Sequence, residues 1–309
     1  MSYSTRQIIV FLSVAFGGAW AVWLLLYVVT KNNQDPSFVS SLAFITSVMA
    51  MWSPALGVLV LWLSNKRKRV LTPSLQFHIR NRWKVYLAAW LVPIGCVLLG
   101  ALGFFLLLPH DLDLSLSGMR QSLQLPSETV PDEAIPSIVG ISLVSGVFIA
   151  PIINTLPALG EELGWRGFLY PALAERLRPR YAHLIMGVIW GFWHTPINTM
   201  GHNYATEYPG YPWLGIIVMS VFCFGAGTFL SYLTERSGTI WPAALGHGTI
   251  NAVGGFPVII ATNDLPHRIF GPGISGLIVS LPFVLLAAWL IPRFQRTEQF
   301  PIQEEGVGG

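Results

Sequence analysis

Residues 85–108 read VYLAAWLVPIGCVLLGALGFFLLL, an unbroken run without a charged side chain. A helix that crosses the hydrocarbon core of a bilayer needs about 20 mostly apolar residues, because its backbone N–H and C=O groups must all be paired within the segment. The run therefore predicts a transmembrane helix. The whole chain has the same character, since 53% of its 309 residues are hydrophobic and 11% are charged. These proportions exclude a soluble globular protein.

Seven other stretches have this composition, so the expected fold class is all-α, a polytopic membrane protein with about eight transmembrane helices. The first stretch continues beyond the small residues at 19–21 into further apolar sequence. We therefore expect it to be a retained helix and not a cleaved signal peptide. The eight stretches cover residues 8–29, 41–64, 85–108, 136–158, 182–200, 213–233, 239–261 and 273–292.

The positive charges indicate the orientation of these helices. With the N-terminus in the cytoplasm, only Lys31, Arg120 and Arg268 of the 18 Lys and Arg residues lie outside. This asymmetry predicts an even number of crossings with both termini cytoplasmic. The composition and the basic loops suit a bacterial plasma membrane, and a eukaryotic endoplasmic reticulum is the alternative. The net charge of +3 is then a topology signal and gives no reason to expect a nucleic-acid partner. A basic loop that attracts anionic headgroups is the alternative.

The chain divides into three expected parts. Residues 1–135 hold three N-terminal helices and an external loop, residues 136–292 form a transmembrane core, and residues 293–309 are a cytoplasmic tail. Within the core, Gly167–Arg180 has apolar and charged residues at helical spacing. This pattern predicts an amphipathic helix on the cytoplasmic surface of the membrane.

The first polar motif of the core reads Glu161-Glu162-Leu-Gly-Trp-Arg166. Ionisable side chains are costly within a bilayer, so they indicate an intramembrane polar site. Glu162 and Arg166 are four residues apart and can pair on one helix face, whereas Glu161 is rotated by about 100° and stays free. A free carboxylate suits a general base. An interfacial ion-pair cluster at the end of the span is the structural alternative.

Two further motifs follow in later spans. Trp190 precedes His194 by four residues, and His247 precedes Asn251 by four residues, between glycines at 246 and 248. His247 and Asn251 therefore share one face of an apolar helix and need a ligand or a partner. A hydrogen-bonded clamp between helices would also satisfy them. Three polar positions in separate spans favour one shared site over three unrelated packing roles.

These residues resemble the motifs of the CAAX prenyl protease type 2 and bacteriocin-processing family of intramembrane proteases, also called the Abi family. The resemblance covers residues 155–255, although Trp190 stands where the family usually has Phe. It implies an all-helical endopeptidase whose site opens to the cytoplasm and acts on a peptide or lipidated protein within the bilayer. The matching motifs are Glu-Glu-x-x-x-Arg at Glu161, Glu162 and Arg166, aromatic-x-x-x-His at Trp190 and His194, and His-x-x-x-Asn at His247 and Asn251.

The resemblance also implies a role for each residue. Glu161 and His194 would activate a water molecule, His247 and Asn251 would stabilise the oxyanion, and Glu162, Arg166 and Trp190 would support the site.

A catalytic zinc ion held by Glu161, His194 and His247 is the alternative to a metal-free site. No His-Glu-x-x-His pair enforces zinc geometry, so we expect no cofactor. The only cysteines, Cys96 and Cys223, lie in separate spans and form no metal motif.

Other functions explain the sequence less well. Gly273–Gly276 has the Gly-x-Ser-Gly form of rhomboid serine proteases, but no histidine follows Ser275. The chain shows no internal repeat typical of a transporter. A non-catalytic membrane relative, acting in bacteriocin self-immunity or as a binding scaffold, remains the main alternative. No residue specifies the substrate.

Overall fold

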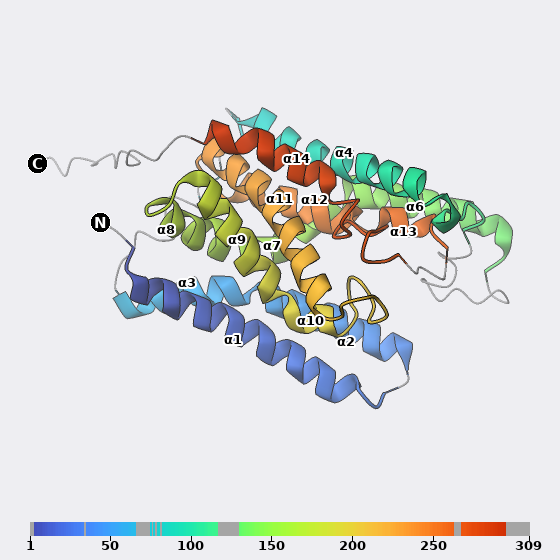
Figure 1. Ribbon diagram of the computed structural model, residues 1–309, viewed down its shortest axis with the longest axis horizontal. Helices are drawn as coiled ribbons and strands as arrows, with labels where there is room; N and C mark the ends of the chain where they lie inside the picture. Colours follow the sequence, from blue (N-terminus) through green and yellow to red (C-terminus); the bar gives the residue numbers. More distant parts are fainter. Residues whose placement is uncertain are drawn as a thin grey trace, which may run out of the picture.

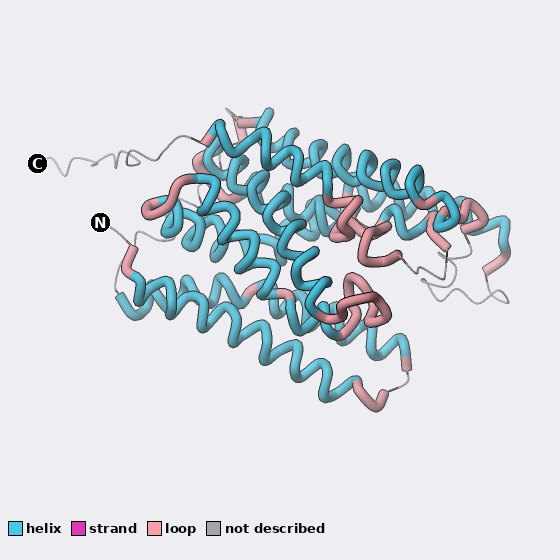
Figure 2. Tube along the Cα trace, in the orientation of Figure 1, coloured by secondary structure: helices cyan, strands magenta, loops and turns pink. Residues whose placement is uncertain are grey.

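The computed structural model describes residues 3–33, 35–65, 75, 77, 79–80, 82–116, 130–262 and 267–294. Throughout these ranges the regular structure is helical, apart from one isolated antiparallel bridge between Leu112 and Ala261 (Figure 2). The predicted all-α class is therefore confirmed. Three parts of the sequence analysis lie outside the described residues: the basic run at 66–69, residues 117–129 of the external loop, and the tail from 295.

Three N-terminal helices form a layer along one side of the bundle (Figure 1). They are α1 (Thr5–Thr30), α2 (Pro36–Met51) and α3 (Ser53–Asn65). Helix α1 begins in a capping box, in which the Ser4 hydroxyl accepts from the Gln7 backbone and the Gln7 side chain accepts from the Ser4 backbone. The expected span 41–64 is thus built from α2 and α3, which are separated at Trp52.

The remaining helices surround α11 and α12, which lie at the centre of the bundle (Figure 1). Helix α11 packs against α9 and α14, and α12 packs against α7 and α4. The described elements are α4 (Trp83–Leu107), η3 (Pro109–Asp111), η4 (Asp132–Ala134), α6 (Ile135–Phe148), α7 (Ala150–Gly164), η5 (Trp165–Leu169), α8 (Tyr170–Ala174), α9 (Pro179–Trp193), α10 (Thr195–Thr199), α11 (Trp213–Ser237), α12 (Trp241–Val253), α13 (Phe256–Ile259), α14 (Leu281–Leu290) and η6 (Ile291–Arg293).

Four described segments are long and apolar enough to cross a membrane: Thr5–Thr30, Ser37–Ser64, Trp83–Leu107 and Trp213–Ser237. A fifth arises if Ile135–Phe148 and Ala150–Ala174, which meet at an angle of 50°, count as one span. Long apolar helices with exposed leucines, such as Leu98, Leu99, Leu106 and Leu107 on α4, agree with a polytopic membrane protein.

Three of the expected crossings, 182–200, 239–261 and 273–292, contain shorter helices than the sequence suggests. Helix α9 has 15 residues, α12 has 13 and α14 has 10. Helix α9 ends shortly before Pro196, whose ring nitrogen cannot donate to the preceding turn, and α12 ends at the glycine pair 254–255. The number of eight crossings therefore stays a prediction.

The expected amphipathic surface helix at Gly167–Arg180 is wrong. Helix α7 continues through η5 into α8, which ends at Ala174, and Phe168 and Leu169 are fully buried. Phe168 packs against Tyr3 and Phe11 of the N-terminal segment. The apolar face is therefore covered by α1 and its N-terminal end and does not lie on lipid.

Helix α4 approaches the segment before α14 closely at Gly100. A Cβ atom at Gly100 would lie 2.2 Å from the Val279 carbonyl oxygen, whereas a Cβ atom at Gly103 would meet only Ile278 Cγ2 at 3.9 Å. Only glycine therefore fits at the first position.

We expect Gly100→Ala to lower the free energy of unfolding by about 1–3 kcal/mol, because the neighbouring backbone must shift. Thermal unfolding in detergent measures the effect. The matched control is Gly103→Ala, which should leave stability unchanged or slightly raised because alanine favours the helix. Equal melting temperatures for the two variants would contradict the close approach.

Candidate active site

The end of α7 carries two adjacent carboxylates that the fold buries almost completely. Glu161 is 2% exposed and Glu162 is 0% exposed. Glu162 Oε1 accepts a hydrogen bond from Arg166 Nη1 at 2.9 Å, which confirms the pair expected from their spacing. Arg166 is itself 1% exposed, so it belongs to this site and not to a cytoplasmic loop.

The helix changes its winding directly after the carboxylates. Residues Trp165–Leu169 form the π-helical turn η5, in which the Tyr170 N–H donates to the Trp165 carbonyl. Such wide turns are rare and occur frequently at functional sites. Beyond the turn, the Tyr170 hydroxyl donates to Glu235 of α11 at 2.8 Å. The wide turn thus lies between the carboxylates of α7 and a hydrogen bond that holds this segment to α11.

Glu161 does not stay free, contrary to expectation. Its Oε2 atom accepts two hydrogen bonds from indole N–H groups, one from Trp165 at 2.9 Å and one from Trp190 at 2.7 Å. Neither donor carries a full charge, so Glu161 forms no ion pair through this oxygen. The two donors fix the carboxylate through Oε2 and leave Oε1 as the oxygen near His247.

His247 of α12 lies between the two carboxylates. Its Nδ1 atom is 2.8 Å from Glu162 Oε1, and its Nε2 atom is 3.9 Å from Glu161 Oε1. Because a carboxylate only accepts, Nδ1 is the donor in the first contact. The second separation is too long for a direct hydrogen bond but short enough for one water molecule to contact both atoms.

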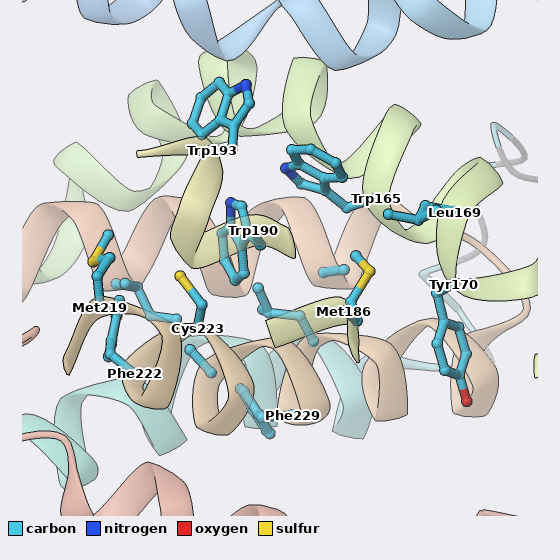
Figure 3. Close-up of a cluster of buried hydrophobic side chains, with 14 of the residues drawn as sticks. Trp165, Leu169, Tyr170, Met186, Trp190, Trp193, Met219, Phe222, Cys223 and Phe229 are labelled. Carbon is cyan, nitrogen blue, oxygen red and sulfur yellow. The ribbon is translucent and has the colours of Figure 1, made fainter. Parts of the chain in front are cut away.

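Trp190 of α9 contacts several residues of this cluster. Besides donating to Glu161, its ring lies 4.6 Å from the Arg166 guanidinium carbon and 5.3 Å from the His247 ring. Its carbonyl lies 2.8 Å from His194 Nδ1, which must be the donor. Figure 3 shows Trp190 within the adjoining cluster of buried hydrophobic side chains, between Trp165 and Cys223. A phenylalanine, usual at this position in the resembling family, could not donate to Glu161.

The other two expected residues lie farther from the carboxylates. His194 is half-buried at the junction of α9 and α10, and its Nε2 atom has no hydrogen-bond partner in the described part of the chain. Asn251 lies one turn after His247 but is exposed, and its side chain forms no hydrogen bond with any described residue. His247 and Asn251 are therefore on one helix without contacting each other through a hydrogen bond.

Two glycines, on α11 and α12, allow close contacts with the segment that carries the carboxylates. A Cβ atom at Gly248 would lie 2.7 Å from both the Pro151 carbonyl oxygen and the Thr155 nitrogen, so α12 can lie directly on α7. A Cβ atom at Gly227 would lie 3.0 Å from Arg166 Nη2. Gly248, directly after His247, thus admits the neighbouring helix α7.

Sequence analysis did not identify two polar groups of this region. Trp165 was missed as a ligand of Glu161, although it lies four residues later on the same helix face. Asn198, four residues after His194, is buried, and its Oδ1 accepts from Asn203 Nδ2 at 2.6 Å. Helical spacing was the available signal in both cases.

The residues proposed as alternative zinc ligands were Glu161, His194 and His247. Among the described residues, no group of three or more His, Cys, Asp or Glu side chains is placed so that it could hold a metal ion. The polar cluster is instead held by indole N–H groups, an arginine and hydrogen-bonded imidazoles.

The fold and this site define a class: a polytopic helical membrane protein in which two buried carboxylates and an imidazole from separate helices meet inside the bundle. Comparison with known proteins gives the family. Residues 142–253 match the type II CAAX prenyl endopeptidase Rce1-like family, and all seven expected site residues lie within this segment. Residues 142–253 are therefore similar to this family, which confirms the resemblance.

A curated relative supports this assignment. The chain is 33% identical over 78 residues to CAAX prenyl protease 2 of Methanococcus maripaludis. The matched region covers 25% of this chain, and the chain spans about a quarter of the relative, 26% of its length.

We expect Trp190→Phe to lower kcat about 10-fold or more in a peptide cleavage assay, because it removes a buried donor from a carboxylate while keeping an aromatic ring. The matched control is Trp213→Phe, since Trp213 lies at the start of α11 and is 69% exposed. A Trp190→Phe protein with wild-type kcat would show that the indole N–H of Trp190 is not needed.

Proposed function

We propose that this chain is an intramembrane endopeptidase in which Glu161 and His194 activate water while His247 and Asn251 stabilise the oxyanion. The observation that carries the proposal is the 3.9 Å separation of Glu161 Oε1 and His247 Nε2 in a buried site, within a segment that matches a protease family. A reacting water and a carbonyl oxygen need such neighbouring polar groups.

The hydrogen bonds support the role of each proton acceptor. Trp165 and Trp190 occupy Oε2 of Glu161, so Oε1 is available to take a proton from water. The His194 Nδ1–H donates to the Trp190 carbonyl, which leaves Nε2 with a lone pair in the neutral ring. Each group therefore has an acceptor atom available to take a proton from water.

The proposed chemical step uses these groups. The activated water oxygen attacks the peptide carbonyl carbon, and the carbonyl oxygen becomes an oxyanion. His247 Nε2–H and the Asn251 amide donate to that oxygen. Because Nδ1 of His247 already donates to Glu162, donation from Nε2 requires both ring protons, and the two adjacent carboxylates balance that charge. The proton taken from water then passes to the leaving amine as the C–N bond breaks.

The proposed substrate is a peptide or lipidated protein that reaches the site from the bilayer. The relative's name, CAAX prenyl protease 2, favours a prenylated C-terminal Cys-a-a-X segment, and an unmodified peptide is the other substrate class. The proposed location is a bacterial plasma membrane with both termini cytoplasmic. In support, α1 begins and α14 ends at the same end of the bundle (Figure 1).

A non-catalytic relative, acting in bacteriocin self-immunity or as a binding scaffold, is the second candidate. The exposed position of Asn251 favours it, because no described side chain aims this amide at His247. In that case the buried cluster of Glu161, Glu162, Arg166 and His247 would serve packing alone.

We expect Glu161→Gln to abolish cleavage of peptides in nanodiscs, with a loss of at least about 1,000-fold in kcat, since the amide cannot accept a proton from water. Prenylated and unprenylated peptide libraries read by mass spectrometry would identify the substrate class in the same experiment. The matched control is Glu207→Gln, an exposed carboxylate outside the site.

Equal cleavage by wild type and Glu161→Gln would refute the proposed mechanism. No cleavage by wild type across both libraries, with folded protein, would favour the non-catalytic candidate.

The proposed reaction uses no metal. Elemental analysis of purified, active protein should therefore find far less than one equivalent of zinc, and a chelator should leave kcat unchanged. A stoichiometric metal whose removal abolishes cleavage would favour the alternative set of Glu161, His194 and His247.

A further inference from the structure

Helix α1 lies outside the matched segment 142–253, yet one of its faces lies directly on the candidate site. The buried residues of α1 recur every three or four positions, and the opposite face carries exposed apolar residues such as Leu24 and Leu25. The buried stripe consists of Phe11, Ala15, Ala19, Trp23 and Leu26. A buried stripe with this helical period indicates that one face of α1 packs against the rest of the protein.

We propose that α1 positions the candidate catalytic residues, and that Trp20 is the positioning residue for His194. This proposal rests on the proposed function and assigns to an N-terminal helix, outside the matched family segment, a part in the same site. It depends on two sets of contacts, one to the end of α9 and one to the π-helical turn after α7.

The first set is a reciprocal pair of hydrogen bonds between α1 and the last residue of α9. Trp20 Nε1 donates to the Trp193 carbonyl at 3.0 Å, and Trp193 Nε1 donates to the Ala15 carbonyl at 3.0 Å. Carbonyl groups at the end of a helix lack partners within the helix. Trp20 supplies a donor to the carbonyl of Trp193, which is the residue directly before His194.

The local sequence explains why α9 needs this partner. Pro196 has no N–H group, so the chain cannot continue the α9 hydrogen bonds through this position. The Thr195 hydroxyl instead donates to the Phe192 carbonyl at 2.6 Å. The α9 end is therefore held by side chains, and one of these, Trp20, comes from α1.

Trp23 adds a direct contact with the histidine. Its ring lies 4.8 Å from the Trp193 ring and 6.4 Å from the His194 ring, with an angle of 28° between the planes of Trp23 and His194. His194 is thus bounded by Trp23 of α1 and by Trp190, whose carbonyl accepts from its Nδ1. The ring orientation of His194 depends on both helices.

The second set of contacts reaches Glu161. Phe11 of α1 meets Trp165 edge to face at 5.7 Å, and Trp165 is one of the two donors to Glu161. Trp165 also lies 5.9 Å from Trp193. In Figure 3, Trp165 and Trp193 lie on the side of the cluster that faces the blue ribbons of the N-terminal helices. Helix α1 therefore contacts the side chains that hold both proposed proton acceptors.

Trp20→Phe tests the positioning role because it removes the N–H donor but keeps a ring beside Phe16 and Phe192. With a peptide that the wild type cleaves, we expect kcat to fall about 3- to 10-fold, the effect of one lost hydrogen bond, with KM changed less than 2-fold. The matched control, Trp213→Phe, should leave both constants unchanged.

A second measurement does not require activity. In protein labelled with ¹³C-histidine, the His194 signal is assigned by its loss in His194→Gln. Trp20→Phe should shift or broaden this signal, while the signal of His267, on the outer loop, stays unchanged. Trp193→Phe, which removes the opposing donor, should have the same effect and replaces Trp20→Phe if that variant does not fold.

The outcomes separate the two proposals. A lower melting temperature with unchanged kcat and an unchanged His194 signal would make Trp20 a packing residue and overturn the inference. If the wild type cleaves no peptide but the His194 signal responds to Trp20→Phe, the proposed function fails and the positioning role stands. An unchanged His194 signal in both tryptophan variants overturns the positioning role in either case.

Discussion

The arrangement of the site depends on one oxygen atom, Glu162 Oε1, which contacts both Arg166 and His247. A carboxylate in an apolar bundle is stable only when its charge is balanced and hydrogen-bonded. The contact with Arg166 lies within one continuous helix, and the contact with His247 joins that helix to α12. Satisfying a single buried charge therefore fixes α7 against α12 and places the His247 ring beside Glu161.

Indole groups hold the second carboxylate of the site, Glu161, in place. Trp165 and Trp190 orient Glu161 without adding a charge. The Trp190 ring also lies against Arg166, and the Trp190 backbone carbonyl accepts from His194. Trp193 extends the same set of rings to α1. An indole has a broad apolar face and one strong donor, so it can fill a helix interface and still satisfy a polar atom. This combination lets a largely apolar core hold several ionisable groups.

Helical spacing predicted the contacts within one helix but not those between helices. The Glu162–Arg166 pair was foreseen, and the four-residue step from Glu161 to Trp165 would have been accessible by the same rule. The bond from Trp190 to Glu161 spans 29 residues and depends on how α9 packs, which no local pattern encodes. Hydropathy located the apolar stretches, but it does not register where Pro196 or the glycines at 254 and 255 end a helix. Likewise, the amphipathic pattern after Gly167 did not reveal that α1, and not lipid, covers its apolar face.

The π-helical turn at Trp165–Leu169 has a consequence for how this segment can change over time. A π-helical turn contains about one residue more than an α-helical turn, so the residues beyond it are rotated by about 100° relative to a continuous α-helix. This rotation lets Glu161 and Glu162 face α9 and α12 while Tyr170 reaches Glu235 on α11. Loss of one residue here would restore the α-helical register and turn one half of the segment away from its partners. The segment is therefore intolerant of insertions and deletions even at positions where a substitution would be harmless.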